Sequence, residues 1–109
     1  MKNPKQLVLQ FKIDGHGSEK DFDGLVEIEE KLNAALQRNG EGYVDGHDIG
    51  SGEMNIYIII KTWERGTWFM EQYLKNQPWN NDAILAKDLR NGSYKVLWPK
   101  RYEGDFAIA

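Results

Sequence analysis

The chain has no cysteine, and this absence excludes several classes of protein at once. A disulfide framework, a thiol nucleophile and a zinc ribbon all need cysteine. Small secreted domains usually depend on disulfides. The lack of cysteine therefore favours a location in a reducing cytoplasm, and the chain is bacterial in style. The N-terminal MKNPKQLVLQF has only a short alternating apolar stretch, unlike the continuous apolar core of a signal peptide.

Long apolar runs and basic stripes are also lacking. No apolar run approaches the roughly 20 residues that span a bilayer. The formal charge is −3, and the one local basic cluster is Lys100–Arg101. A nucleic-acid partner normally requires a basic stripe that neutralises phosphates. We therefore expect neither a membrane nor a nucleic acid as partner, and no motif indicates a cofactor.

What is present is typical of one small globular domain. The 109 residues are 40% hydrophobic and 28% charged, which argues against wholesale disorder. There is no internal repeat, low-complexity tract or linker. A single domain over residues 1–109 is the simplest interpretation.

The spacing of apolar residues predicts the elements. Residues 6–14 alternate between apolar and polar, as in a half-buried strand, whereas residues 22–38 have apolar side chains every three or four positions, including Phe22, as in an amphipathic helix. Ser18 or Asp21 could cap this helix, and Gly46 suggests a bulge in the strand that follows it. The remaining predictions are a polar strand over 43–49, an apolar strand over 54–62, a helix over 63–77 that starts near Thr67, and a hairpin of strands over 83–89 and 94–98.

This order of elements predicts an α+β fold of the ferredoxin-like type. The pattern β-α-β-β-α-β with one additional C-terminal strand places two helices on one face of an antiparallel sheet. In that topology the sheet order is fourth, first, third, second, so the first and third strands are central. They are also the two most apolar strands, which agrees with this arrangement.

The same topology predicts a polar cluster at one end of the sheet, because the first two strands run in the same direction. The candidate residues are Asp14, His16, Asp45, His47 and Asp48. The histidines could act as ligands or as acid–base groups, and Asp45 and His47, two residues apart on a strand, could bind one divalent metal. The competing interpretation is that these Asp and Gly residues only form turns; we favour it, so no metal is predicted.

A second candidate surface is the sheet face that the helices leave open. It should carry Tyr57 and Ile59, and an exposed apolar patch there would favour self-association. Among the tryptophans, the spacing favours core positions for Trp68 and Trp98. Trp63 and Trp79 lie in polar surroundings and are the better candidates for exposed partner contacts.

The stretch from Gly42 to Ile58 contains Asp-Gly-x-x-x-Gly-x-Gly-Glu-x-Asn before an apolar strand. In this it resembles small uncharacterised bacterial proteins of ferredoxin-like layout, over the hairpin of residues 45–61 and the preceding helix. The resemblance implies the layout and transfers no catalytic residue, because no activity is assigned to those proteins.

Three functions are consistent with these observations. The absence of a catalytic motif favours a non-catalytic binding or protein-interaction domain, for example an immunity-type or regulatory protein, with a protein partner or a second copy in a homodimer. The alternative is a small enzyme of the dimeric α+β barrel type, with both histidines in a pocket between sheet and helices. An RNA-recognition domain is disfavoured by the negative charge and by the few aromatic residues on the central strands.

Overall fold

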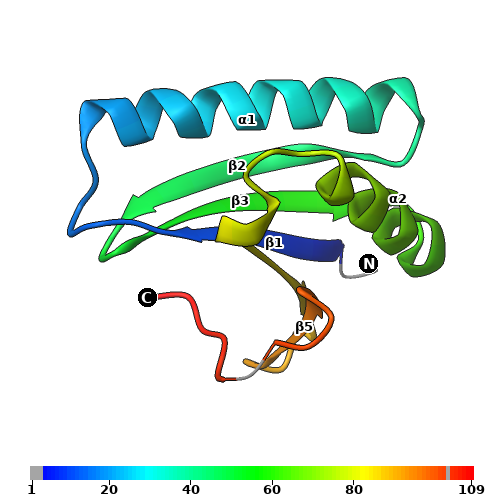
Figure 1. The fold of residues 1–109 in the computed structure, drawn as a ribbon. Coiled ribbons are helices and arrows are strands. Elements are labelled where there is room, and N and C mark those ends of the chain that lie inside the picture. Colours follow the sequence, from blue (N-terminus) through cyan, green and yellow to red (C-terminus); the bar gives the residue numbers. More distant parts are fainter. Residues whose placement is uncertain (1–3, 103) are drawn as a thin grey trace.

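The computed structural model describes residues 4–102 and 104–109, which form one five-stranded sheet and two α-helices (Figure 1). The predicted order of helices and strands is confirmed, and a short 3₁₀ helix precedes the fourth strand. The elements in chain order are β1 (Lys5–Lys12), α1 (Glu19–Arg38), β2 (Gly42–Gly50), β3 (Glu53–Ile60), α2 (Trp63–Lys75), η1 (Asn80–Asp82), β4 (Ala83–Asp88) and β5 (Tyr94–Trp98).

The sheet has the strand order β2-β3-β1-β4-β5, and every neighbouring pair is antiparallel. The two most apolar strands, β1 and β3, are therefore inside the sheet, as the order of elements and their apolar character predicted. Leu9 shows the register: its neighbours across the strands are Ile56 on β3 and Leu85 on β4. The fifth strand, whose place the sequence left open, extends the sheet beyond β4.

Both α-helices pack on one face of this sheet and enclose the main core. Alternate residues of β1 and β3 meet leucines of α1 and α2 there, and the largest of them are fully buried. Ser18 and Asp21 together begin α1, because the Ser18 hydroxyl accepts from the Asp21 N–H while the Asp21 carboxylate accepts from the Ser18 N–H. In the described part of the chain, neither helix has the length and apolar character needed to cross a membrane.

Helix α2 begins at Trp63, four residues earlier than the sequence indicated. Gly66, Met70 and Leu74 form its buried stripe, so the helix backbone lies directly against Ile60 of β3 at the glycine. The expectation that Trp68 is a core residue is wrong. Trp68 lies two positions from Met70, about 200° around the helix, and is 59% exposed.

Trp63 and Trp79 are less exposed than predicted, because both pack against the core. Lys87 lies over the Trp63 ring, with its Nζ 4.2 Å from the ring centroid. Trp79 meets Phe11 edge to face at 5.3 Å between centroids. Trp98 is also partly buried against the core, which agrees with its prediction, and its indole N–H donates to the Asn80 carbonyl.

The opposite face of the sheet is partly covered by the chain itself. Figure 1 shows β5 and the last residues of the chain on the side of the sheet away from α1. Val8 and Ala86, which point to that side, are fully buried. Tyr57 and Ile59, which we expected on an open surface, are half-buried there. No local pattern in the sequence indicated this cover, since residues 99–102 and 104–109 form no helix or strand.

Candidate functional site

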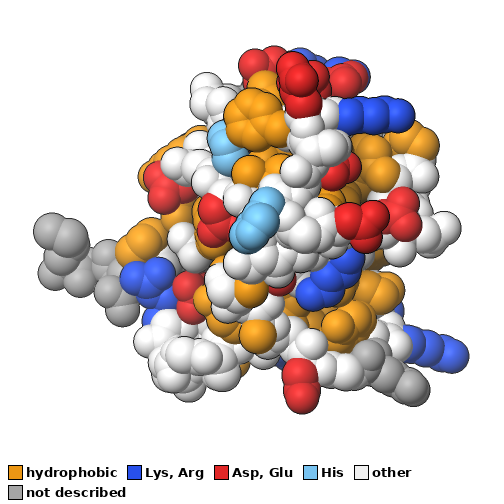
Figure 2. All heavy atoms as spheres, turned by 90° about the vertical axis from the view of Figure 1, so that its left-hand side faces the viewer, with side chains coloured by type: hydrophobic (Ala, Val, Ile, Leu, Met, Phe, Trp, Pro, Cys, Tyr) orange, Lys and Arg blue, Asp and Glu red, His pale blue; other side chains and the backbone are white. Residues whose placement is uncertain are grey.

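The loops that follow β1 and β2 meet at one end of the sheet, as predicted. The Gly52 N–H donates to the Gly15 carbonyl, and the Ile13 N–H donates to the Gly52 carbonyl at 3.0 Å. Figure 2 looks onto this end, where both histidines are visible at the surface. His16 lies beside the β2–β3 turn: a Cβ added at Gly50 would be 3.7 Å from its Nδ1.

The five candidate residues are not gathered in one place, because Asp48 and His47 lie on opposite faces of the sheet. Asp14 is exposed, and its carbonyl accepts from the Gly17 N–H in a turn. Asp48 pairs with Asn55 on the face away from the helices. His47, the preceding residue, points to the other face, toward α1. Neighbouring residues on a strand point to opposite sides, so one strand cannot bring both to one ligand.

Asp48 belongs to a polar network on the face away from the helices. Its carboxylate accepts from the Tyr57 hydroxyl at 2.6 Å and from the Asn55 amide at 2.9 Å. Burial, and then the hydrogen bond to Asp48, raise the pKa of Tyr57 above its ordinary value. Tyr57 therefore remains a neutral donor to Asp48 at physiological pH.

His47 is held by the carboxylate of Glu29 on α1. Its Nδ1 lies 2.8 Å and 3.0 Å from the two oxygens of Glu29 on α1. A carboxylate only accepts, so Nδ1 carries the proton and donates to Glu29. In the neutral ring Nε2 is then an acceptor and could accept a hydrogen bond from a partner.

A shallow cleft of about 400 Å³ between α1 and β2 contains this pair. The strand register shifts between Val44 and Gly46, which confirms the predicted bulge and places Asp45 at it. Asp45 and His47 do line one cleft, together with Glu29, Glu30 and Asn33.

No group of three His, Asp or Glu side chains among the described residues is arranged to hold a metal ion. The side chains that line the cleft include three carboxylates and no hydroxyl or thiol.

One signal for Glu29 was present in the sequence. Leu25, Leu32 and Leu36 are the buried residues of α1, and Glu29 lies four positions after the first and three before the second. A carboxylate on an apolar stripe usually has a specific partner, since burying it alone is costly. The partner itself, 18 residues away, was not indicated by any local pattern.

Phe22 completes the surface on this side of the molecule. The sequence placed it on the buried face of α1, but it is 43% exposed. Its ring lies beside the ring of His47 in a T-shaped arrangement, with the two centroids 5.9 Å apart. The surroundings are acidic, since α1 carries six acidic and three basic side chains. Figure 2 shows acidic groups gathered over α1 at the top of this view.

A second cleft, of about 300 Å³, lies between the two helices. Ile28, Tyr73 and Trp79 contribute its apolar surface, and the Glu27–Lys31 ion pair lies at its edge. Neither histidine lines it. Across the described residues every buried side-chain nitrogen and oxygen has a hydrogen-bond partner.

Comparison with known proteins identifies no relative: no family model, no curated protein and no solved structure matches this chain. What the geometry establishes is a small α+β protein with a five-stranded antiparallel sheet and two α-helices.

Proposed function

We propose that this chain is a non-catalytic protein-binding domain whose α1–β2 side receives a basic partner. The observation that carries the proposal is Phe22, a large apolar side chain exposed beside His47 on an acidic surface. Aromatic anchors surrounded by polar groups are common hot spots of protein interfaces. The acidic helix would steer a basic partner toward this anchor.

The Glu29–His47 pair supports the same role. Glu29 fixes the ring of His47 through Nδ1, and the His47 ring in turn packs against the ring of Phe22. A surface residue that is held in place before binding loses less entropy when the partner arrives. An immunity-type protein that blocks a basic enzyme, or a regulatory protein, would use such a surface.

The alternative function, a small enzyme with a pocket between sheet and helices, has less support. That proposal required both histidines in one pocket, whereas His47 faces α1 and His16 lies over the β2–β3 turn. The space between sheet and helices is filled by leucines and isoleucines that are fully buried. A protein-binding surface therefore accounts better for where the polar and aromatic side chains lie.

A photo-crosslinking experiment tests this function. A benzophenone amino acid is placed at position 22 and, in a matched control, at Leu89, which is 40% exposed on the β4–β5 side. In the cells in which the protein occurs, we expect a discrete adduct from position 22, identified by mass spectrometry, because the partner covers that residue. Adducts of equal pattern from both positions, or none from position 22, would refute the proposed surface.

A further inference from the structure

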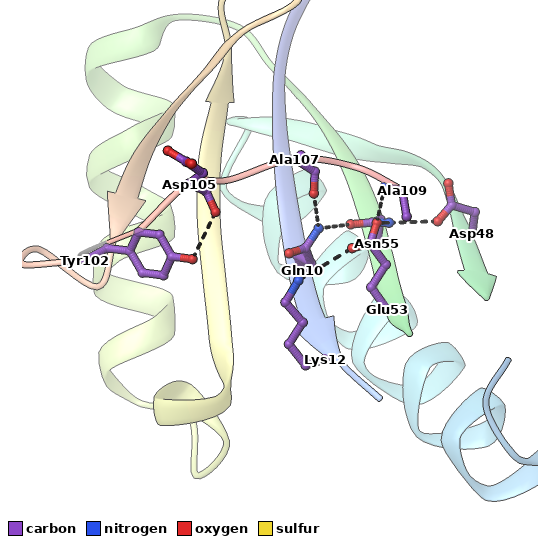
Figure 3. A network of polar contacts seen from close by, with 9 residues as sticks. All are labelled: Gln10, Lys12, Asp48, Glu53, Asn55, Tyr102, Asp105, Ala107 and Ala109. Atoms are coloured by element: carbon purple, nitrogen blue, oxygen red, sulfur yellow. Dashed lines mark hydrogen bonds and ion pairs between the residues drawn. The ribbon is translucent and has the colours of Figure 1, made fainter. Parts of the chain in front are cut away.

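The last residues of the chain cross the sheet on the face away from the helices. We call residues Gly104–Ala109 the strap. Figure 3 shows it running across β4 and β1 toward β3, so it does not lie alongside any strand. Phe106 and Ile108 are half-buried, while Asp105, Ala107 and Ala109 between them are exposed. The strap thus has alternate large side chains turned to the protein.

Under the strap the sheet presents polar side chains where apolar ones are usual. Gln10 and Asn55 are 1% exposed and Glu53 is 4% exposed, on the two central strands of the sheet. They form one network: the Gln10 amide donates to the Asn55 Oδ1 at 3.0 Å, and the Asn55 amide donates to Glu53 and to Asp48. Lys12 adds an ion pair to Glu53 at 3.7 Å.

This network binds the strap through its main chain. The Gln10 Nε2 donates to the Ala107 carbonyl at 3.0 Å, and the Glu53 Oε1 accepts from the Ala109 N–H at 2.7 Å (Figure 3). Hydrogen bonds to the main chain can form with any extended segment. Which sequence binds therefore depends on the side chains at alternate positions of that segment. For Phe106 the contact is the ring of Tyr94 on β5, edge to face at 5.2 Å.

Stability alone does not explain buried polar groups at this place. Burying an amide or a carboxylate is unfavourable unless it is fully bonded, and well-packed apolar residues of the same volume would stabilise the sheet as well or better. Donors and acceptors aimed off the sheet at a main chain are instead the arrangement of a peptide-binding face. The strap shows what fits there: an extended backbone with a large apolar residue at every second position.

We propose that this face of the sheet is a binding site for an extended segment of a partner protein with large apolar residues at alternate positions, and that the strap is its occupant within the chain. A partner segment gains access when it displaces the strap. The proposal does not depend on the function proposed for the α1–β2 side, since Phe22 and the strap lie on opposite faces of the sheet.

The test uses the full chain with Phe106→Ser and Ile108→Ser, which weaken the strap and leave the helix-side core untouched. The probe is a fluorescent, C-terminally amidated hexapeptide with the sequence of residues 104–109, GDFAIA, and binding is followed by anisotropy. We expect saturable binding to the variant, at least about tenfold tighter than to the wild-type chain, because the attached strap competes at a high effective concentration.

Two controls make the result specific. The peptide GDAFIA has the same composition but adjacent large residues, and it should not bind. Adding Gln10→Met to the weakened variant should reduce affinity for GDFAIA about fivefold, the effect of one lost hydrogen bond. Circular dichroism and amide NMR spectra establish that each variant keeps the fold, and the single Phe106→Ser variant replaces the double variant should the latter unfold.

Several outcomes would overturn the proposal. The proposed site is absent if the folded variant does not bind GDFAIA. It is also absent if the variant binds GDAFIA equally well, because the site should require large residues at alternate positions. Equal affinity of the wild-type and weakened chains would place the peptide elsewhere. A wild-type dimer in sedimentation that the strap substitutions abolish would show that the occupant is the strap of a second copy and not a segment of another protein.

Discussion

Replacing Ile58 by alanine should reduce the free energy of unfolding by about 4 kcal/mol, since a fully buried isoleucine leaves a cavity that its neighbours cannot close. Ile58 lies on β3 between Leu7 of β1 and Val44 of β2, and its side chain points to the helix-covered face. Urea denaturation followed by tryptophan fluorescence measures the change.

The matched control is Ile59→Ala, one residue along the same strand. Ile59 points to the other face and is half-buried, so we expect a loss of about 1 kcal/mol. The pair tests the assigned faces of β3 directly, because a shift of one residue in register would exchange the two values. Equal losses at both positions would contradict the arrangement described here.

Gly66→Ala should destabilise the protein although alanine is the better helix former. The new Cβ would lie 2.5, 2.6 and 2.8 Å from three side-chain atoms of Ile60, which is itself buried and branched at Cβ. Overpacking of this kind costs about 3 kcal/mol, and the gain in helix propensity of about 1 kcal/mol offsets only part of it. We expect a net loss of about 2 kcal/mol in the same denaturation experiment.

Gly24→Ala on α1 should have the opposite sign. Apart from its chain neighbours and the nearby backbone of α1, no described atom lies within 4 Å of a Cβ added there, so only the helix propensity changes and stability should rise by about 1 kcal/mol. Opposite signs for two helical glycines would show that α2, and not α1, approaches the sheet by direct backbone contact. Stabilisation by both substitutions would contradict the close packing of α2 on β3.

The sequence predicted the fold wherever local periodicity was strong. The apolar character of β1 and β3, together with the order of elements, predicted their place inside the sheet, and the last two strands were predicted as the β4–β5 hairpin. Periodicity was ambiguous on α2, where aromatic residues lie on several sides. Gly66 decided its orientation, because close contact with Ile60 turned Trp68 outward.

The candidate sites were harder to predict, because they depend on contacts between distant residues. Gln10 bonds to Ala107, 97 positions later, and no local pattern encodes such a pairing. His47 was a candidate residue from the sequence, but its partner Glu29, 18 positions away, was not. The one available sign was the charged Glu29 on the apolar stripe of α1. It indicated that Glu29 has a partner but did not indicate that the partner is His47.

The affinity of the partner found by crosslinking measures the central claim most directly. Isothermal titration of Phe22→Ala and Leu89→Ala compares two side chains of similar exposure on opposite sides of the molecule. We predict that Phe22→Ala weakens binding about 30-fold, corresponding to about 2 kcal/mol, while Leu89→Ala leaves it unchanged within about twofold. Wild-type affinity for both variants, or a loss confined to Leu89→Ala, would contradict a binding surface on the α1–β2 side.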